Sequence, residues 1–349
     1  KVVMVTGVAG FIGSNCAERL IARGDIVIGL DEANDYYDVR IKRANLERLE
    51  RLAGDSGNFR FFEGDSCNVE FITKIFEDEK PRWMLHLAAR AGVRPSIEDP
   101  FVYIHSNVEA TTRLLELSRK NGCEHFVFAS SSSVYGGSTK SLFSETDDVS
   151  NPVSPYAATK KSCELIGFTY NHLYQLPVAG LRFFTVYGPG GRPDMAPFKF
   201  VDRVSRGVEI QQFGDGSSSR DYTFVEDIVD GCLRTLDRPC GYQVYNLGNG
   251  EPTRLKEFID IVQRCTERKA IIKILPDQPG DVPRTCADIT KARTMLGYNP
   301  NTKFADGMAK TVEWYKTSYA PNLAADAKKA PVNALKRPVS TLNFRSECL

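Results

Sequence analysis

The chain has 349 residues, of which 42% are hydrophobic and 26% charged, an ordinary composition for a globular protein of one large or two smaller domains. Its 45 basic and 44 acidic residues give a formal charge of +1, which excludes a strong field for nucleic acid or an anionic membrane surface. Any anionic ligand must therefore be held by local groups.

Apolar runs alternate with helical patterns over the first half of the chain. Val2–Thr6 and Ile26–Leu30 are apolar runs, and Asn15–Arg23 between them has helical periodicity, which predicts a βαβ unit. Further strands and helices are expected in alternation at Phe59–Glu63, Val69–Glu79, Trp83–Ala88, Val108–Asn121, Phe126–Ser130, Ala158–Leu173 and Val178–Phe183. This alternation predicts an α/β fold of the Rossmann type, a doubly wound parallel sheet covered on both faces.

Beyond Gly188, proline and glycine become more frequent and the elements become shorter. Short elements are expected at Phe198–Arg206, Ile228–Leu236, Leu255–Arg264 and Ala305–Tyr315. We predict a Rossmann domain over residues 1–188, to which later segments can return, and a smaller C-terminal α/β substrate lobe over 189–318. Residues 319–349 end in an Ala-, Lys- and Pro-rich stretch without periodicity, which predicts a disordered tail.

A glycine loop joins the first strand to the first helix. In the Gly-x-x-Gly-x-x-Gly spacing, Gly7 permits a tight turn, Gly10 lets the backbone approach a pyrophosphate, and Gly13 lets helix pack on strand. Asp31, at the end of the next strand, is suited to accept from an adenosine ribose, and Glu32 adds a charge that repels a 2′-phosphate. The context predicts bound NAD rather than NADP, over a glycine-rich turn without a ligand.

Tyr156 and Lys160 lie four residues apart on a predicted helix, hence on one face. Removing a proton from a sugar hydroxyl needs a base that titrates near neutral pH, and a free tyrosine titrates only at about 10. A neighbouring ammonium and a positive nicotinamide ring stabilise a phenolate, so we expect Tyr156 to act as the base with Lys160 as its partner. Ser131 ends a strand at the ligand side of the sheet, where it can bond the reacting oxygen; a polar turn is the alternative.

Together these motifs resemble a known family. The glycine loop, His86–Ala89, the Ser-Ser-x-x-Val-Tyr-Gly segment and Tyr-x-x-x-Lys resemble the extended short-chain dehydrogenase/reductases. Further segments are similar to the UDP-glucuronate 4-epimerases among them, namely Asn34–Asp38, Ala91–Arg94, Arg182–Pro189, Gly191–Ala196 and Gly280–Pro283. The similarity extends over residues 1–318.

The resemblance implies a mechanism and a dimer. NAD stays bound, Tyr156 removes the proton of the C4 hydroxyl while hydride leaves C4, the 4-keto sugar turns over, and hydride returns to its other face. UDP-glucuronate would thereby become UDP-galacturonate with no net redox change. The family implies a homodimer, for which Val108–Asn121 and Ala158–Leu173 are the candidate interface helices.

The expected site residues fall into two groups, and no metal ligand is expected. The cofactor contacts are Gly7, Gly10, Phe11, Ile12, Gly13, Asp31, Asn34, Asp65, Ser66, Leu87, Ala88, Ala89, Asn107, Tyr156 and Lys160. The UDP-sugar contacts are Arg94, Ser131, Ser132, Ser133, Thr185, Arg192, Arg220 and Asp281. The resemblance implies that Arg192 and Arg220 hold the diphosphate, that Arg94 lines the sugar pocket and that Asp281 contacts the nucleoside. Asp65 suits the adenine amino group.

The serine run bears on the fate of the keto sugar. The resemblance implies acids at the positions of Ser132 and Ser133 in related dehydratases, and at that of Ser133 in related decarboxylases. Here hydroxyls are expected to hold the sugar carboxylate and slow the loss of CO₂. Gly190 and Arg284 depart from the family pattern and leave the sugar preference open. The alternatives are a 4-epimerase of neutral UDP-sugars, a net reductase and a non-catalytic NAD-binding regulator.

The cysteines and the N-terminus bear on the compartment. Nine cysteines are scattered without a Cys-x-x-Cys pair, which favours neither zinc nor disulfides and indicates a reducing, cytoplasmic setting. No apolar run is long enough to span a bilayer, so we expect no membrane contact. The chain enters a strand-like run directly after Lys1, so we expect a natural N-terminus upstream that can carry a targeting segment.

Overall fold

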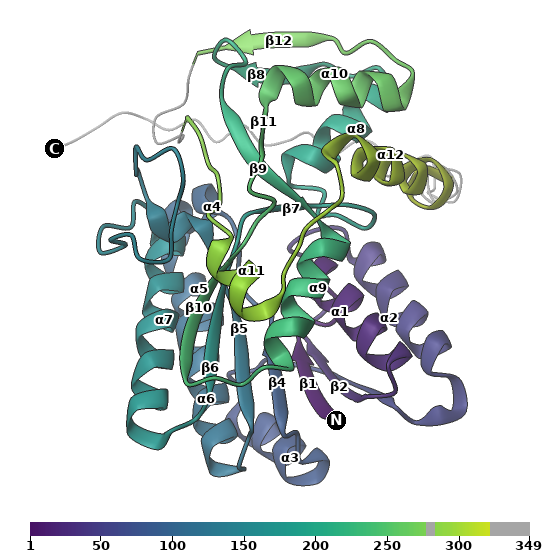
Figure 1. Cartoon of the computed structure of the whole chain (residues 1–349). Coiled ribbons are helices and arrows are strands. Elements are labelled where there is room, and N and C mark those ends of the chain that lie inside the picture. The colour runs from purple at the N-terminus through teal and green to yellow at the C-terminus, as the bar shows by residue number, and fades with distance from the viewer. Residues whose placement is uncertain (277–282, 322–349) are drawn as a thin grey trace, which may run out of the picture.

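The computed structural model describes residues 1–276 and 283–321 (Figure 1). Its main body is a seven-stranded parallel sheet in the order β10-β6-β5-β4-β1-β2-β3. The strands are β1 (Val2–Thr6), β2 (Ile26–Asp31), β3 (Phe59–Glu63), β4 (Trp83–His86), β5 (His125–Ser131), β6 (Val178–Phe183) and β10 (Tyr242–Leu247). Because β1 pairs with both β2 and β4, the chain winds first to one side and then to the other. This is the doubly wound order, and the predicted fold class is confirmed.

Helices cover both faces of this sheet, and β1 shows why. Its residues alternate between faces, so that Val3 and Val5 join one hydrophobic core and Met4 joins the other. The first core also takes side chains from α1 (Phe11–Ala22), α2 (Val39–Ala53) and α9 (Val225–Leu236), and the second from α3 (Val69–Glu79), α6 (Ala110–Lys120) and α7 (Pro155–Tyr174). Both sides of each central strand are therefore buried, as the apolar runs predict.

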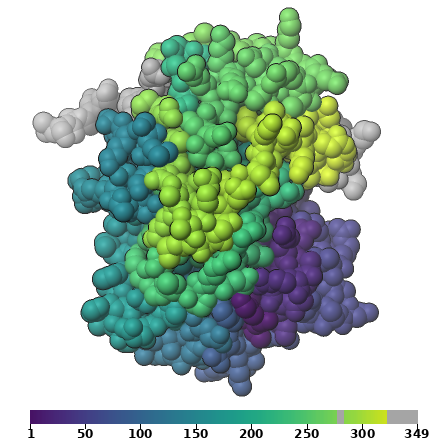
Figure 2. All heavy atoms as spheres, viewed as in Figure 1, coloured from purple at the N-terminus to yellow at the C-terminus, as the bar shows by residue number. Residues whose placement is uncertain are grey.

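A smaller α/β assembly lies at one end of this sheet (Figure 1). It contains β7 (Thr185–Tyr187), α8 (Ala196–Arg206), β8 (Ile210–Phe213), β9 (Ser219–Phe224), β11 (Pro252–Arg254), α10 (Leu255–Thr266), β12 (Ile272–Leu275) and α12 (Phe304–Trp314). The strands form two small sheets, β11-β9-β7 and β12-β8. Figure 2 shows this part packed directly on the main body. The chain also returns from it, because β10 joins the main sheet beside β6.

The remaining helices of the described residues are short. They are η1 (Gly54–Ser56), α4 (Val93–Glu98), α5 (Pro100–Tyr103), the π-helix η2 (Ile104–Glu109), η3 (Ser132–Tyr135), α11 (Thr290–Leu296) and the π-helix η4 (Tyr315–Tyr319). Within the described ranges, none of the helices is both long and apolar enough to cross a membrane. The predicted disordered tail lies outside the described residues from position 322 onward, as does the candidate Asp281.

Several predicted elements begin or end one to four residues away from the observed bounds, and two of these differences lie at the candidate site. The first helix begins at Phe11 rather than Asn15, since its opening turn contains Gly13 and Ser14, which hide the helical periodicity. The helix expected at Val108–Asn121 is α-helical only from Ala110, because the chain enters it through a π-helical turn. That turn aims the side chains of its residues differently from an ordinary helix.

Candidate active site

The glycine loop between β1 and α1 has no room for a side chain at Gly7 or Gly13. A Cβ on Gly7, which has φ of +71°, would lie 2.7 Å from the Ala88 nitrogen, and one on Gly13 would lie 2.0 Å from the Gly7 carbonyl oxygen. Gly10 is the N-cap of α1, whose first turn, Phe11–Ser14, is uncharged. The N–H groups and positive dipole end of this helix are therefore not opposed by a negative charge in its first turn, which suits phosphate.

Asp31 lies beside this loop at the end of β2. Its carboxylate accepts from the Ala9 N–H at 3.0 Å and from the Ala33 N–H at 2.8 Å. Burial raises the pKa of Asp31, although these bonds and Lys42 act in the opposite direction. The Lys42 ammonium also donates to the backbone and side-chain oxygens of Asn34, at 2.8 and 2.9 Å. The segment that carries Asp31 and Asn34 is thus fixed against the glycine loop.

The loop that follows β4 lies against Gly7 of the glycine loop. The Ala88 N–H donates to Thr6 Oγ1 at 3.1 Å, which holds Leu87–Ala89 above Gly7. Asn107 of η2 is buried, and its amide accepts from the Arg90 N–H at 2.8 Å and donates to Thr159 Oγ1 at 3.0 Å. Asn107 therefore ties this loop to α7 with both ends of its side chain.

Asp65 and Ser66 lie in the loop that follows β3. Asp65 Oδ1 accepts from the Cys67 N–H at 2.8 Å, and Oδ2 lies 2.9 Å from His105 Nε2. Because β2 and β3 are parallel neighbours, this loop emerges at the same sheet edge as Asp31. The predicted adenosine contacts are thereby gathered along one edge.

Tyr156 and Lys160 occupy the first two turns of α7. The helix begins after Ser154, whose hydroxyl caps it, and the Tyr156 N–H donates to Ser96 Oγ of α4 at 3.1 Å. Lys160 is 4% exposed, and its ammonium donates to the Ala129 carbonyl oxygen of β5 at 2.8 Å. A buried cation is thus anchored to the sheet one helical turn from the tyrosine, as an electrostatic partner for a phenolate requires.

The serine run ends β5 next to this helix. Ser131 Oγ accepts from the Ser133 N–H at 3.1 Å, and Ser132 lies between them at the start of η3. Ser131 pairs in the sheet with Phe183, the last residue of β6, and Thr185 follows two positions later. The hydroxyls of Ser131–Ser133 and of Thr185 therefore come from neighbouring strand ends.

A cavity of about 770 Å³ lies between α4, α8 and the small sheets. Three predicted substrate residues, Arg94, Thr185 and Arg220, line it. Its charged lining consists of the cations Arg94, Lys199, Arg203 and Arg220 and the acids Asp194 and Asp215. Although the whole chain is nearly neutral, four cations against two acids give this wall a net positive charge. Guanidinium groups on such a wall suit the oxygens of a diphosphate.

Arg192 is joined to the cavity through Asp194. Its Nε lies 3.0 Å from Asp194 Oδ1, and Nη2 lies 2.5 Å from Oδ2, so the pair is bidentate. The guanidinium also lies 5.5 Å from the ring centroid of Tyr36, whose hydroxyl donates to the Ala91 carbonyl oxygen. Arg192 thus connects the small assembly to the loops of the main sheet.

The sequence-based search missed three residues of this region. Lys199 and Arg203 lie four positions apart on α8, and that helical spacing is a signal that could have found them. Ser96 gives no such signal, because its contact with Tyr156 joins residues 60 positions apart. It holds the start of α7 against the helix that carries Arg94.

Comparisons with known proteins agree with this geometry. A family model described as GDP-mannose 4,6 dehydratase matches residues 4–311. A relative from Thermodesulfobacterium geofontis named UDP-glucuronate 4-epimerase is 43% identical, over 90% of this chain and 95% of its own. The Bacillus cereus UDP-glucuronic acid 4-epimerase, solved with UDP-glucuronic acid and NAD, superposes with a TM-score of 0.85 at 32% identity, over 91% of this chain and all of that one. A Thermotoga maritima UDP-glucose 4-epimerase, solved with UDP-glucose, gives 0.83 at 31%, over 90% and 99%.

Proposed function

Because the chain belongs to the family of the GDP-mannose 4,6 dehydratase model, with named UDP-glucuronate 4-epimerases among its relatives, we propose that it converts UDP-glucuronate to UDP-galacturonate. The reaction passes through a 4-keto sugar and uses NAD as a catalyst. One observation carries the proposal. The glycine loop follows β1, Lys160 donates to Ala129 of β5, and Ser131 ends β5, so these groups lie at the carboxyl ends of parallel strands, and Thr185, just beyond β6, lines the cationic cavity.

The residues at this edge fit NAD. A dinucleotide is bound by a tight glycine turn, as at Gly7 and Gly13 where a Cβ would clash, and by a helix N-terminus without acidic residues, as in α1. Asp31 and Glu32 favour a free ribose 2′-hydroxyl over a phosphate. Asn34, Asp65 and Ser66 would complete the adenosine side, and Leu87–Ala89, in the loop held by Asn107, would face the pyrophosphate. When bound, NAD would supply reversible hydride transfer at C4 of the sugar.

Side chains of this protein carry out the proton transfers. Tyr156 takes the proton of the C4 hydroxyl and later returns one to the C4 oxygen. Lys160, fixed by the Ala129 carbonyl, stabilises the phenolate form of Tyr156 electrostatically. Ser131 donates to the reacting oxygen from the end of β5. General acid–base catalysis of this kind contributes about 10²–10⁴ in rate.

Two sets of groups recognise the substrate. The diphosphate is held by the cationic cavity wall, in which Lys199 and Arg203 join Arg94 and Arg220. The sugar carboxylate accepts bonds from the hydroxyls of Ser131–Ser133 and Thr185. Hydrogen bonds from these hydroxyls stabilise the bound carboxylate and would be lost as CO₂ leaves, so the loss of CO₂ is slowed and the keto sugar is returned as an epimer.

A product assay by NMR tests this assignment. With UDP-glucuronate and no added cofactor, we expect UDP-galacturonate to accumulate until both epimers are present, because NAD is retained and regenerated. Substantial UDP-pentose in the mixture would contradict the role of the serines. Stoichiometric consumption of added NADH would instead indicate a net reductase.

A second candidate is the epimerisation of neutral UDP-sugars, which the similarity to the Thermotoga maritima structure favours. The two candidates separate when UDP-glucuronate and UDP-glucose are supplied at equal concentration. The proposed hydroxyl contacts lead us to expect a clear preference for the uronate. Faster turnover of UDP-glucose would make the neutral sugar the substrate.

We further propose that two copies associate through the α6–α7 side. Exposed apolar side chains lie on α7, where Leu165 and Phe168 are 57% and 52% exposed, and on α5, which contacts α7 and where Phe101 is 78% exposed. Replacing Leu165 and Phe168 together with Glu should convert the dimer to a monomer, as measured by light scattering after size exclusion. The matched control is Ile274→Glu, since Ile274 is 68% exposed but lies on β12, far from α7 (Figure 1). A wild-type mass of one chain, or a double variant that stays dimeric, would contradict the interface.

We propose a reducing, cytoplasmic compartment for this protein. Cys16, Cys163 and Cys232 are buried free thiols of the described chain, a state that a reducing cytoplasm preserves.

A further inference from the structure

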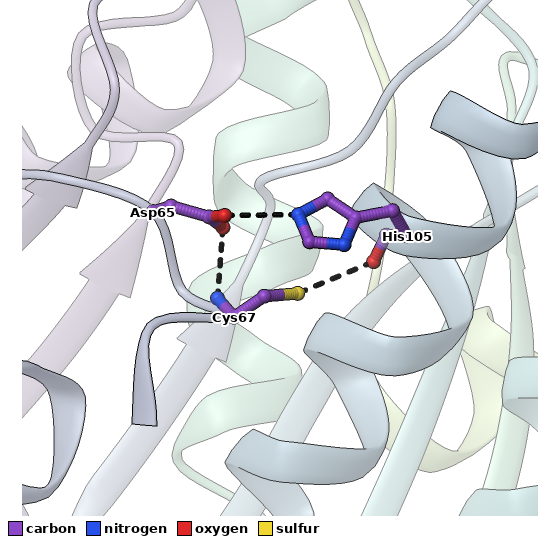
Figure 3. Close-up of side chains that lie close together, drawn as sticks. All are labelled: Asp65, Cys67 and His105. Carbon is purple, nitrogen blue, oxygen red and sulfur yellow. Dashed lines mark hydrogen bonds and ion pairs between the residues drawn. The ribbon is translucent and has the colours of Figure 1, made fainter. Parts of the chain in front are cut away.

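A cluster of potential metal ligands lies where the β3–α3 loop meets the π-helix η2 (Figure 3). It consists of the Asp65 carboxylate, the Cys67 thiol and the His105 imidazole, whose ligand atoms all lie within 4.8 Å of one another. The sequence concealed it, because His105 stands 38 positions from Cys67 and the cluster contains no Cys-x-x-Cys pair. The π-helical turn brings the imidazole to the loop, and such turns often mark functional sites.

We propose that these three side chains bind one divalent zinc ion per chain. Sulfur, imidazole nitrogen and carboxylate oxygen are the donors that zinc prefers, and a water can complete a tetrahedron. His105 Nε2 and Asp65 Oδ2 lie 2.9 Å apart and need to separate by only a few tenths of an ångström to place both at about 2.0–2.1 Å from zinc. The thiol needs a rotation away from the His105 carbonyl oxygen, to which it donates at 3.4 Å.

The groups behind the imidazole support this assignment. His105 Nδ1 lies 3.0 Å from Glu109 Oε2, and Arg113 fixes the other oxygen of Glu109 at 2.6 Å. A carboxylate on the far nitrogen of the ring is the arrangement that orients histidine ligands in zinc proteins and makes them more basic. The Glu109–His105 contact therefore prepares Nε2 to act as the ligand.

The charges balance for a dication. The carboxylates of Asp65 and Glu109 lie 2.9 and 3.0 Å from the two ring nitrogens of His105. With Cys67 bound as a thiolate, Asp65 and Cys67 would supply two negative charges to the ion. Glu109 behind the ring adds a nearby negative charge that favours a bound cation.

The ion can reach the site and leaves the proposed cofactor contact intact. The side chains of His105 and Asp65 are 45% and 37% exposed. Zinc takes Asp65 Oδ2, while Oδ1, which already accepts from the Cys67 N–H, keeps a lone pair for the adenine amino group. The zinc site therefore does not depend on the proposed reaction, although it shares Asp65 with the proposed cofactor site.

Cobalt titration of the protein as purified, after treatment with a chelator, tests the site. Thiolate ligation of Co²⁺ gives a sulfur-to-metal charge-transfer band, and we expect one ion per chain that Zn²⁺ displaces. Cys67→Ser should abolish the band, and His105→Gln should weaken zinc binding at least tenfold. The matched controls are Cys240→Ser and His172→Gln, both at exposed positions elsewhere, which should bind as wild type.

The possible results distinguish a zinc site from a simple hydrogen-bonded pair. No charge-transfer band, a stoichiometry far below one, or a band that survives Cys67→Ser overturns the site and leaves Asp65 and His105 as a simple hydrogen-bonded pair. None of these readouts uses turnover, so the zinc site can fail while the epimerase assay succeeds, and the reverse. A higher Tm with zinc in the wild type but not in the Cys67→Ser variant would support the site independently.

Discussion

Tyr156→Phe should lower the turnover of UDP-glucuronate by about 10²–10⁴-fold, the range expected when a general base is removed. The variant loses only the hydroxyl, and the ring still packs edge-on against Tyr103, at 6.1 Å between centroids. The glycine loop and Asp31 are untouched, so bound NAD should remain at the wild-type level. Turnover is measured by NMR, and NAD is measured in the denatured protein.

Tyr103→Phe is the matched control for this experiment. Tyr103 is a buried neighbour of the same ring, and its hydroxyl donates to the Ala91 carbonyl oxygen at 3.1 Å. We expect Tyr103→Phe to keep turnover within a few-fold of wild type. Unchanged turnover in Tyr156→Phe, or an equal loss in both variants, would refute Tyr156 as the base.

Arg182→Met should lower the free energy of unfolding by about 3–5 kcal/mol, the usual cost of breaking a buried ion pair from one side. Arg182 and Glu164 are both nearly inaccessible, and their two bonds measure 2.8 and 2.9 Å. The change leaves the buried Glu164 carboxylate without its main partner; among the described residues, Ser130 and the partly exposed Lys161 also donate to it. Urea unfolding monitored by fluorescence gives the difference.

Two comparisons make this second prediction specific. Replacing both Arg182 and Glu164 with Met should cost less than Arg182→Met alone, since no charge is left buried. Lys74→Met, which breaks the exposed pair of Lys74 and Asp78, should change stability little. Equal losses in the single and double Met variants would show that packing, and not the stranded charge, sets the cost.

The same pair predicts a dependence on pH. Burial alone would raise the pKa of Glu164, but the bonds from Arg182 and Ser130 outweigh it and leave the pKa lowered from 4.5. Because the folded-state pKa lies below the unfolded one, the pair stabilises the fold fully above about pH 4.5 and loses this effect as the pH falls through the folded value. Wild type should therefore lose stability in acid more steeply than the double Met variant.

Local patterns explain what the sequence could predict. The central strands were found because both of their faces are buried, which gives continuous apolar runs such as Val2–Thr6. The glycine loop was found because its chemistry lies within seven consecutive residues. Asp31 and the Tyr156–Lys160 pair followed from fixed offsets along one strand and one helix.

What the sequence did not reveal depends on contacts between distant segments. Strand β10 was missed because it lies at the sheet edge, where Tyr242, Gln243 and Val244 are only partly buried and no continuous apolar run forms. The contact between Cys67 and His105 depends on a π-helical turn, which hydrophobic periodicity in the sequence does not predict. The cavity wall combines residues from several elements. Of its cations, Lys199 and Arg203 give a signal in the sequence, because they lie four positions apart on one helix.

The late arrival of β10 has a consequence for synthesis on the ribosome. The partner that covers the edge of β6 begins at Tyr242, roughly 60 residues after β6 ends at Phe183, which takes about 3–12 s at 5–20 residues per second. Throughout that interval the nascent chain presents the open backbone of a buried, apolar strand, which is a template for pairing with another chain. A cell that makes this protein must therefore shield one sheet edge for seconds, and translation speed between these two strands should affect yield more than speed elsewhere.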